Sequence, residues 1–439
     1  MHPKALIDAC TELVRQVLKF DHSADAVVSQ FFKQNRKSLG LGPRERAALS
    51  GAVYSVLRQK LLFDHLSPSG SGPKERRMAI LGFAHHQDQL AHSPQAGKGT
   101  AARDFLRSAL SESEKKWIEQ CDAVDRSALL ERHRHNLPEW LVASLKAQLG
   151  ERFWDYVAAL NLPQGLDLRV NTLAHKRTEV QALLQKERIA SEPTPFSPWG
   201  LRLLDKPNVT DSDAFKKGAV EVQDEGSQLL ALLVDAKRGE MVVDFCAGGG
   251  GKTLALGAAM RNTGRLYAMD TSAHRLDGLK PRLARSGLSN VHPVAIAHER
   301  DERIKRLSGK IDRVLVDAPC SGLGTLRRSP DLKWRQSPDG VNGMAEQQYA
   351  ILDSAARLLK PGGRLVYATC STMVEENEAV AQAFSQRHTQ WVPLSVKDVL
   401  TELKVDNAAQ VCGEDGLYLR MWPHLHGTDG FFCAMWTAP

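Results

Sequence analysis

The chain contains 439 residues, of which 42% are hydrophobic and 25% charged, and these are ordinary values for a soluble globular protein of about three domains. Its longest apolar run lies near "LLALLV" and is far shorter than the ~18 residues that a membrane span requires, so we expect none. The formal charge of +7 favours a polyanionic partner such as nucleic acid, although an ordinary solvated surface also accommodates a mild excess of Lys and Arg.

The N-terminal stretch "MHPKALIDACTELVRQVLKF" spaces its apolar residues as a helix does and lacks the continuous apolar core of a signal peptide. We therefore expect a mature, cytoplasmic protein. The seven cysteines are odd in number and form no C-x-x-C pair, a pattern that fits neither a disulfide framework nor a zinc site. Most of them should be reduced thiols, and no metal is expected.

Residues 1–135 are predicted to be helical throughout. Apolar residues in "RAALSGAVYSVLRQKLLFDHL" have heptad-like spacing, and Ser111 stands three residues before Glu114, as in a capping box. The polar stretch "HHQDQLAHSPQAGKGTAARD", residues 85–104, predicts a long loop between helices. The first 140 residues contain 21 Lys and Arg against 16 Asp and Glu, so this basic bundle either contacts RNA or presents a solvated surface.

Residues 136–235 mix the helical "EWLVASLKAQLG" with strand-like pieces such as "LDLRVNTL" and "GLRLLD", which indicates a small α+β connector. From residue 236 to 439 the pattern becomes strand, glycine loop and helix, repeated. This alternation predicts an α/β fold with a doubly wound parallel sheet whose ligands bind at the carboxyl ends of the strands.

The run "DFCAGGGGKT" ends one strand and opens a helix, where backbone amides favour a polar or anionic ligand. Gly251, Lys252 and Thr253 imitate the end of a P-loop, but the first glycine of that motif would fall on Cys246. The dinucleotide motif fails as well, because its third glycine would fall on Thr253. Asp270 closes the next strand, where a carboxylate can bind ribose hydroxyls. An adenosine-type cofactor is favoured over a nucleotide triphosphate or a purely structural turn.

Two cysteines follow predicted strands at the same ligand-binding edge. Cys320 comes after "RVLVDAP" and Cys370 after "LVYAT", so both thiols should open onto the reactive end of the cofactor. A thiolate can attack an electron-poor ring, and a thiol pKa of ~8.5 needs only modest tuning for that role. The other cysteines are expected to be small core residues: Cys10, Cys121, Cys412 and Cys433.

Over residues 135–439 the chain resembles the RNA 5-methylcytosine methyltransferases of the RsmB, Nop and Sun type. The resemblance rests on an ordered set of motifs: "LRVN", "VQDEGSQL", "DFCAGGGGKT", "DAPCSGLGTLRRSPDLKW", "YATCSTMVEEN" and "HGTDGFF". Residues 1–135 are more loosely similar to the NusB-like helical domain that precedes the catalytic part in RsmB proteins. The resemblance thus implies a Rossmann-like methyltransferase domain with RNA, in particular ribosomal RNA, as its partner, and neither DNA nor a membrane.

The same resemblance implies that S-adenosylmethionine is the cofactor. Asp270 would bind its ribose, and Gly248, Gly249, Gly250, Gly251 and Lys252 would surround the methionine part. The other expected cofactor-binding residues are Cys246, Ala247, Arg275 and Asp317. In this family the Thr-Cys thiol, here Cys370, adds to carbon 6 of cytosine, and the Pro-Cys thiol, here Cys320, assists release. In DNA cytosine methyltransferases the Pro-Cys thiol attacks instead.

Asp317 is implied to hydrogen-bond the edge of the cytosine, with a strand-end acid that caps backbone amides as the alternative. The segment "LRRSPDLKWR", with Arg327, Arg328, Lys333 and Trp334, is expected to contact single-stranded RNA, with a solvated basic loop as the alternative.

Two departures from the family pattern concern the cofactor. Gly248 and Gly249 replace the usual Ala-Pro, and His298 and Glu299 stand where an aspartate normally contacts adenine. Two rival functions remain, a non-catalytic RNA-binding assembly factor and an NTPase. The presence of both thiols together with Asp317 and Lys252 argues against the first, and Cys246 argues against the second.

Overall fold

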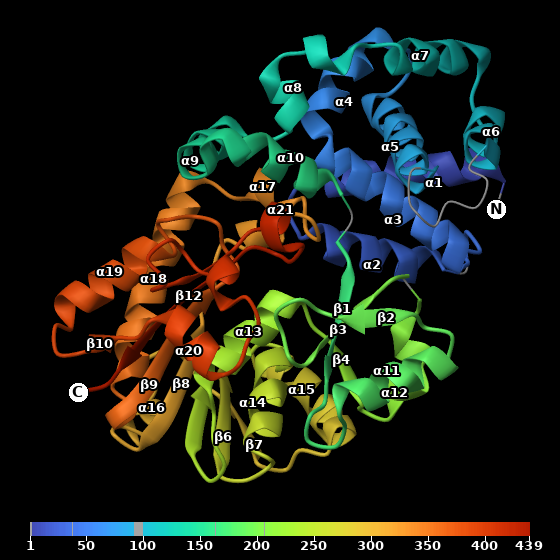
Figure 1. Cartoon of the computed structure of the whole chain (residues 1–439). Helices are drawn as coiled ribbons and strands as arrows, with labels where there is room; N and C mark the ends of the chain where they lie inside the picture. The colour runs from blue at the N-terminus through green and yellow to red at the C-terminus, as the bar shows by residue number, and fades with distance from the viewer. Residues whose placement is uncertain (1, 37, 92–99, 163, 206) are drawn as a thin grey trace. The chain divides into compact units, whose positions relative to one another are not determined.

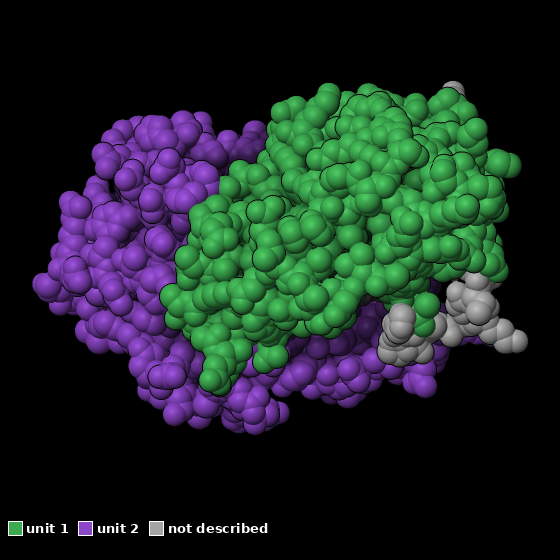
Figure 2. Space-filling model, turned by 90° about the horizontal axis from the view of Figure 1, so that it is seen from above, with its two compact units in different colours: residues 1–162, 326–336 green, residues 163–325, 337–439 purple. Residues whose placement is uncertain are grey.

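The structure is a computed structural model, and it describes residues 2–36, 38–91, 100–162, 164–205 and 207–439, the side chains of residues 100–102 excepted. The chain forms two compact units (Figure 2). Unit 1 comprises residues 1–162 and 326–336, and unit 2 comprises residues 163–325 and 337–439.

Unit 1 is helical, and no strand occurs among its described residues. Helices α1, α3 and α5 pack on one another around fully buried side chains such as Leu13, Leu49 and Met78. The predicted capping box is confirmed, since Ser111 and Glu114 exchange hydrogen bonds at the start of α7. Its helices have these bounds: α1 Pro3–Val17, α2 Ala24–Asn35, α3 Pro43–Arg58, α4 Lys60–Leu66, α5 Lys74–Ala91, α6 Thr100–Ser108, α7 Glu112–Asp122, α8 Glu131–His135, α9 Glu139–Leu149, α10 Phe153–Asn161 and α17 Leu332–Arg335.

The predicted loop over residues 85–104 is shorter than expected. Helix α5 continues to Ala91 and α6 already begins at Thr100, so both ends of the polar stretch are helical. Residues 92–99 between them lie outside the described part of the chain.

The basic segment 326–336 belongs to unit 1, where it packs against α3 and the start of α2. Lys333 is buried and donates to the carbonyl of Arg58 at 2.9 Å, while the indole of Trp334 donates to the carbonyl of Leu57 at 2.8 Å. Asp331 accepts from the backbone N–H of Ala24. Arg327 and Lys333 are buried and the Trp334 indole packs on the helical core, which favours a structural role for these residues over the expected RNA contact.

Unit 2 begins with a small antiparallel sheet in the order β2-β3-β1-β4. Helices α11 and α12 accompany it, so the predicted mixture of helix and strand is present from residue 163, whereas α9 and α10 of the predicted connector 136–235 belong to unit 1. Short apolar strands with a buried face form a small core of their own, which includes Leu168, Val180 and Leu201. The elements are β1 Leu166–Val170, α11 Arg177–Lys186, β2 Ser191–Pro193, β3 Gly200–Leu203, α12 Asp213–Lys216 and β4 Val220–Val222.

The large sheet of unit 2 has the order β10-β12-β9-β8-β5-β6-β7, with β11 paired to β12. Neighbours from β9 to β7 run parallel, and β12 runs antiparallel to β9. The chain fills the sheet outward from β5 to β7, then returns to place β8 on the other side of β5. This reversal is a topological switch point, where doubly wound sheets bind ligands.

The elements of this second part are α13 Glu225–Val234, β5 Met241–Asp244, α14 Gly251–Ala259, β6 Arg265–Asp270, α15 Ala273–Ser286, β7 Val291–Ala295, α16 Glu302–Lys305, β8 Ile311–Asp317, α18 Pro338–Ala356, β9 Leu359–Thr369, α19 Glu378–Arg387, β10 Val392–Pro393, α20 Val396–Glu402, β11 Leu419–Met421, α21 Pro423–His426 and β12 Phe431–Thr437.

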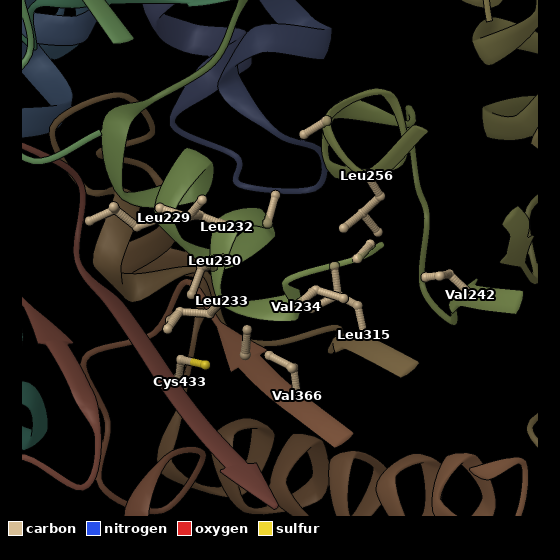
Figure 3. Packing of buried hydrophobic residues seen from close by; sticks show 14 of the residues in the cluster. Leu229, Leu230, Leu232, Leu233, Val234, Val242, Leu256, Leu315, Val366 and Cys433 are labelled. Atoms are coloured by element: carbon tan, nitrogen blue, oxygen red, sulfur yellow. The ribbon is translucent and has the colours of Figure 1, made fainter. Parts of the chain in front are cut away.

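Helices cover both faces of the large sheet (Figure 1). Successive strand residues point to opposite faces, so Val242 packs under α13 and α14 whereas Val243 packs under α18 and α19. The leucines of α13 lie over Val242, Leu315, Val366 and Cys433 (Figure 3). This burial on both faces explains the nearly continuous apolar strands in the sequence. No helix in the described part of the chain is both long and apolar enough to span a bilayer.

Candidate active site

The glycine loop joins the carboxyl end of β5 to the start of α14. Gly248 and Gly250 have φ of +54° and +80°, a region that other residues rarely adopt. A Cβ on Gly250 would lie 2.2 Å from a methyl of Leu279, so only glycine fits there. A Cβ on Gly248 would meet no described atom within 4 Å. The loop is therefore tightly packed on its helix side and open at Gly248, where a ligand can approach the backbone.

Two arginines hold the outer side of this loop. The buried Arg169 donates to the carbonyl of Gly251 and to the side-chain oxygen of Gln223, both at 2.6 Å. Arg282 donates to the carbonyl of Gly249 and pairs with Glu221 at 3.0 Å. The loop carbonyls thus point toward cations from β1 and α15, so the "LRVN" motif of the connector supports the glycine loop.

Three carboxylates lie near the loop, those of Asp244, Asp270 and Asp317. Asp270 accepts from the backbone N–H groups of Gly248 at 2.8 Å and Ser272 at 2.7 Å. Asp244 is fully buried, and this burial raises its pKa to about 7 although Thr253 donates to it at 2.7 Å. The other oxygen of Asp244 meets no donor among the described residues.

The carboxylates act together on Cys246. Burial raises the pKa of this thiol well above its usual value, and the negative charges of Asp317, Asp244 and Asp270 raise it further. Such a concentration of negative charge repels a triphosphate and favours a ligand that carries positive charge. This charge argues against the alternative of an NTPase.

Lys252 and Asp317 form an ion pair between α14 and the end of β8, with 2.7 Å between Nζ and Oδ2. Burial by itself would lower the pKa of Lys252, but the charge and hydrogen bond of Asp317 outweigh it and the pKa is raised. Lys252 therefore stays charged and orients the Asp317 carboxylate at the edge of the sheet that also bears the thiols.

The two thiols are in contact at the sheet edge where both were expected. The sulfur atoms of Cys320 and Cys370 lie 3.3 Å apart, at the carboxyl ends of the neighbouring strands β8 and β9. Their hydrogen bond is the largest cause of a Cys320 pKa well above its usual value, and burial adds to it. The loops also touch through their backbones, because the N–H of Gly324 donates to the carbonyl of Cys370 at 2.9 Å. A Cβ on Gly324 would lie 2.7 Å from that carbonyl.

The remaining predicted residues are more peripheral. Arg275 is exposed in the first turn of α15, and no described residue holds its side chain at the loop. His298 and Glu299 follow β7, where the carbonyl of Glu299 accepts from Ser354 at 2.5 Å. Cys10, Cys121 and Cys433 are buried as expected, whereas Cys412 is only partly buried. No cluster that could hold a metal ion occurs in the described ranges.

The sequence alone indicated no role for Arg169 or Arg282, nor for Gln348 of α18 and the buried Glu376, which hydrogen-bond the loop that carries Cys320. Arg169 lies in "LRVN" and Glu376 in "YATCSTMVEEN", so the motifs that contain them pointed to these two residues. Their chemistry depends on contacts between segments that are far apart in the sequence, which spacing alone does not reveal.

Known proteins match this arrangement. Residues 231–437 match the family model of the 16S rRNA methyltransferase RsmB/F, and residues 137–210 match the ferredoxin-like domain of RsmF/B-like methyltransferases. The chain is 31% identical over 421 residues to a "Probable ribosomal RNA small subunit methyltransferase B" of Bacillus subtilis (strain 168), covering 91% of this chain and 92% of the relative. It is 31% identical over 396 residues to a ribosomal RNA small subunit methyltransferase B of Vibrio cholerae, covering 86% and 88%.

Two solved structures share the fold. The crystal structure of PH0851 matches with a TM-score of 0.76 and 28% identity over 99% of both chains. A methyltransferase homolog protein from Pyrococcus horikoshii matches with a TM-score of 0.60 and 28% identity, covering 72% of this chain and all of that one.

Fold and site together define an S-adenosylmethionine-dependent methyltransferase with a Rossmann-like catalytic domain. Within that class, the chain belongs to the RsmB/F family of ribosomal RNA methyltransferases. The residues present fit the cofactor. S-adenosylmethionine carries a sulfonium and an ammonium, which suit the three carboxylates around Cys246, and the open space at Gly248 lets it approach the loop.

Proposed function

We propose that this enzyme methylates carbon 5 of a cytosine in ribosomal RNA through a covalent bond between Cys370 and the base. The observation that carries the proposal is the pair of sulfur atoms 3.3 Å apart beside the Lys252–Asp317 ion pair. Two thiols at one site suit a reaction in which one attacks the ring and the other assists its release. Bound S-adenosylmethionine supplies the electrophilic methyl group.

The two thiols have different tasks. Cys370 is the sulfur that attacks, as the resemblance to the family implies, and the raised pKa of Cys320, caused first by its hydrogen bond to Cys370, suits this division. A bond from the Cys370 sulfur to carbon 6 makes carbon 5 nucleophilic and divides one difficult step into two easier ones. After methyl transfer carbon 5 loses its proton to solvent, the sulfur–carbon bond breaks, and the ring double bond is restored. Cys320 assists this release.

Asp317 holds the base. Its carboxylate is fixed by Lys252, and it stands three residues before Cys320, within reach of the edge of a flipped cytosine. The base has to leave its stack to reach the thiols, and single-stranded or unstacked RNA is therefore the expected substrate.

For the cofactor we propose Asp270 as the ribose ligand and Gly248, Gly249, Gly250, Gly251 and Lys252 around the methionine part. The site is completed by Cys246, Ala247, Arg275 and Asp317. We also propose the domain limits 1–135 for a helical, NusB-like RNA-binding domain, 136–235 for the connector and 236–439 for the catalytic domain. Seven free thiols suit a reducing compartment, so the cytoplasm is the proposed location.

Bisulfite mapping of total RNA tests the proposal. Cells with and without the gene should differ at one cytosine or a few in ribosomal RNA, and the purified enzyme with S-adenosylmethionine should restore the mark on RNA from the deletion strain. Calorimetry with S-adenosylmethionine and with ATP is the companion measurement, and only the first should bind. An RNA-binding assembly factor without catalysis would leave the bisulfite pattern unchanged in both experiments.

A further inference from the structure

A buried carboxylate lies beneath the two thiols. Glu376 is fully buried in the turn between β9 and α19, and no Lys, Arg or His among the described residues pairs with it. An ionised side chain in such a place is unfavourable unless hydrogen bonds compensate it. Its partners therefore indicate what it does.

These partners are the residues that follow the two cysteines. Oε1 of Glu376 accepts from the backbone N–H of Ser321 at 2.7 Å, and Oε2 accepts from the hydroxyl of Ser321 at 2.5 Å and from the hydroxyl of Ser371. The two hydroxyl oxygens are also only 3.2 Å apart. One carboxylate thus joins the loop of Cys320 to the loop of Cys370.

Gln348 of α18 completes the arrangement. Its amide donates to Oε1 of Glu376 at 3.0 Å and to the carbonyl of Pro319 at 2.9 Å, and its oxygen accepts from Tyr367 at 3.0 Å. Glu376 therefore receives four donors, which is the number of acceptor positions that an ionised carboxylate offers. Pro319 and Ser321, the neighbours of Cys320, are both held.

We propose that Glu376 is a positioning residue that sets the separation of the Cys320 and Cys370 sulfur atoms by holding the residue after each of them. The inference deepens the proposed function and rests on it, because the separation matters only where both thiols serve one base. Glu376 also contributes to the raised pKa of Cys320, after the Cys370 hydrogen bond, burial and the charge of Cys370. Glu376 could therefore act on the thiols in two ways, through its negative charge or through the length of its side chain, and these can be tested separately.

Two substitutions separate them. Glu376→Asp keeps the charge but shortens the side chain by one methylene, so it cannot reach both loops. Glu376→Gln keeps the length, and its NH2 group can donate to the two serine hydroxyls, which rotate to accept. The exposed neighbour Glu375 supplies the matched control, Glu375→Asp.

The first measurement needs neither RNA nor cofactor. The azo compound diamide takes two electrons and two protons from a pair of thiols, which are left as a disulfide, and peptide mapping follows the Cys320–Cys370 bond. The sulfurs must move from 3.3 Å to about 2.05 Å, so the rate reports their separation. The second measurement is methylation, resolved into kcat and KM for S-adenosylmethionine, with thermal unfolding as a check of folding.

We expect Glu376→Asp to lose about tenfold or more in both the disulfide rate and kcat while KM stays unchanged, because small misplacements of reacting groups have effects of that size. Glu376→Gln should keep a disulfide rate at or above that of the native enzyme and recover most of kcat, and Glu375→Asp should match the native enzyme. Ser371→Ala, which removes one arm of the bridge, should fall between them and decides the matter if Glu376→Asp does not fold.

The reverse order would overturn the inference. If Glu376→Asp behaves as the native enzyme and Glu376→Gln is impaired, Glu376 acts through its charge. If all variants form the disulfide at the native rate, Glu376 does not set the separation. A native enzyme that forms the disulfide rapidly but never methylates carbon 5 would contradict the proposed function and leave the disulfide results to judge Glu376.

Discussion

The glycine loop and the thiol loops lie at the same edge of one sheet, but side chains of opposite charge support them, arginines for the first and a glutamate for the second. The glycine loop is held from outside, where Arg169 and Arg282 bind its carbonyls, and its inner side is open at Gly248. The thiol loops are held from beneath by the buried Glu376 and touch each other through Gly324 and Cys370.

The difference follows from what each region has to do. A loop that receives a cofactor has to leave room for a ligand close to its backbone, so its supports lie behind it. A pair of loops that presents two sulfurs to one base has to keep the two sulfur atoms at a fixed distance, so its support, Glu376, binds both loops at once. In both regions the supports are hydrogen bonds, which fix the orientation of a loop, whereas apolar packing is not directional.

The largest expected effect comes from closing the glycine loop. Gly250→Ala should lower the free energy of unfolding by about 3 kcal/mol and abolish S-adenosylmethionine binding, because it adds left-handed strain to a clash with Leu279. Gly248 also has a positive φ, but a methyl group there meets no described atom, so Gly248→Ala should lower the free energy of unfolding by only about 1 kcal/mol. Its methyl group still enters the space proposed for the ligand. Urea unfolding and calorimetry measure both. Equal losses of unfolding free energy in the two variants would show that packing against Leu279 is not what makes the loop rigid.

A smaller effect should follow from removing the outer support. Arg169→Met takes two charge-assisted hydrogen bonds from Gly251 and Gln223, and such bonds contribute about 1.5 to 3 kcal/mol each to the structure that they hold. Calorimetry should show S-adenosylmethionine binding weakened by about tenfold, a change of 1.4 kcal/mol.

The control for Arg169→Met is the thiol region. The diamide-driven disulfide between Cys320 and Cys370 should form at the native rate in this variant, since its support is separate. A slower disulfide together with weaker cofactor binding would mean that the two regions are not independently supported.

The doubly wound class of the catalytic sheet could be predicted from the sequence, because strands buried on both faces and glycine loops before helices leave a strong pattern. The position of Cys320 and Cys370 at one edge of the sheet could be predicted as well, since the carboxyl ends of parallel strands share an edge. Glu376 could not be predicted, because its partners come from two loops and a helix that are distant in the chain.

In segment 326–336 the residue types suggested a role that the observed packing does not favour. Its cations beside an aromatic residue are typical of RNA contact, but the same residue types can pack on helices when carbonyls accept from the cations. Lys333 and Trp334 donate to consecutive carbonyls at the end of α3, those of Arg58 and Leu57. Composition does not distinguish the two environments, because it does not show which carbonyls lie nearby.

The smallest expected effect is a dependence on pH at the base of the glycine loop. The pKa of Asp244 is about 7 in the folded chain against an ordinary value of 3.8, so its contribution to stability is complete below 3.8 and is lost as the pH rises through 7. A cationic cofactor favours the ionised carboxylate. Affinity for S-adenosylmethionine should therefore rise between pH 6 and 8. The rise is at most about tenfold, because the ionised fraction of Asp244 is about tenfold lower one pH unit below its pKa than when the carboxyl is fully ionised.

Asp244→Asn should abolish this dependence, both in calorimetry and in the pH profile of unfolding between pH 4 and 7. An unchanged profile in the variant would assign the titration to another group.

The central claim, that Cys370 attacks and Cys320 releases, is tested most directly by a denaturing gel of single-cysteine variants incubated with substrate RNA and S-adenosylmethionine. Cys320→Ala should accumulate a protein–RNA adduct that survives denaturation, because attack and methyl transfer proceed but release is impaired. Cys370→Ala should form no adduct and no methylated RNA, because the attacking sulfur is absent. An adduct in Cys370→Ala and none in Cys320→Ala would show that the roles are exchanged, and no adduct in either variant would contradict the covalent mechanism.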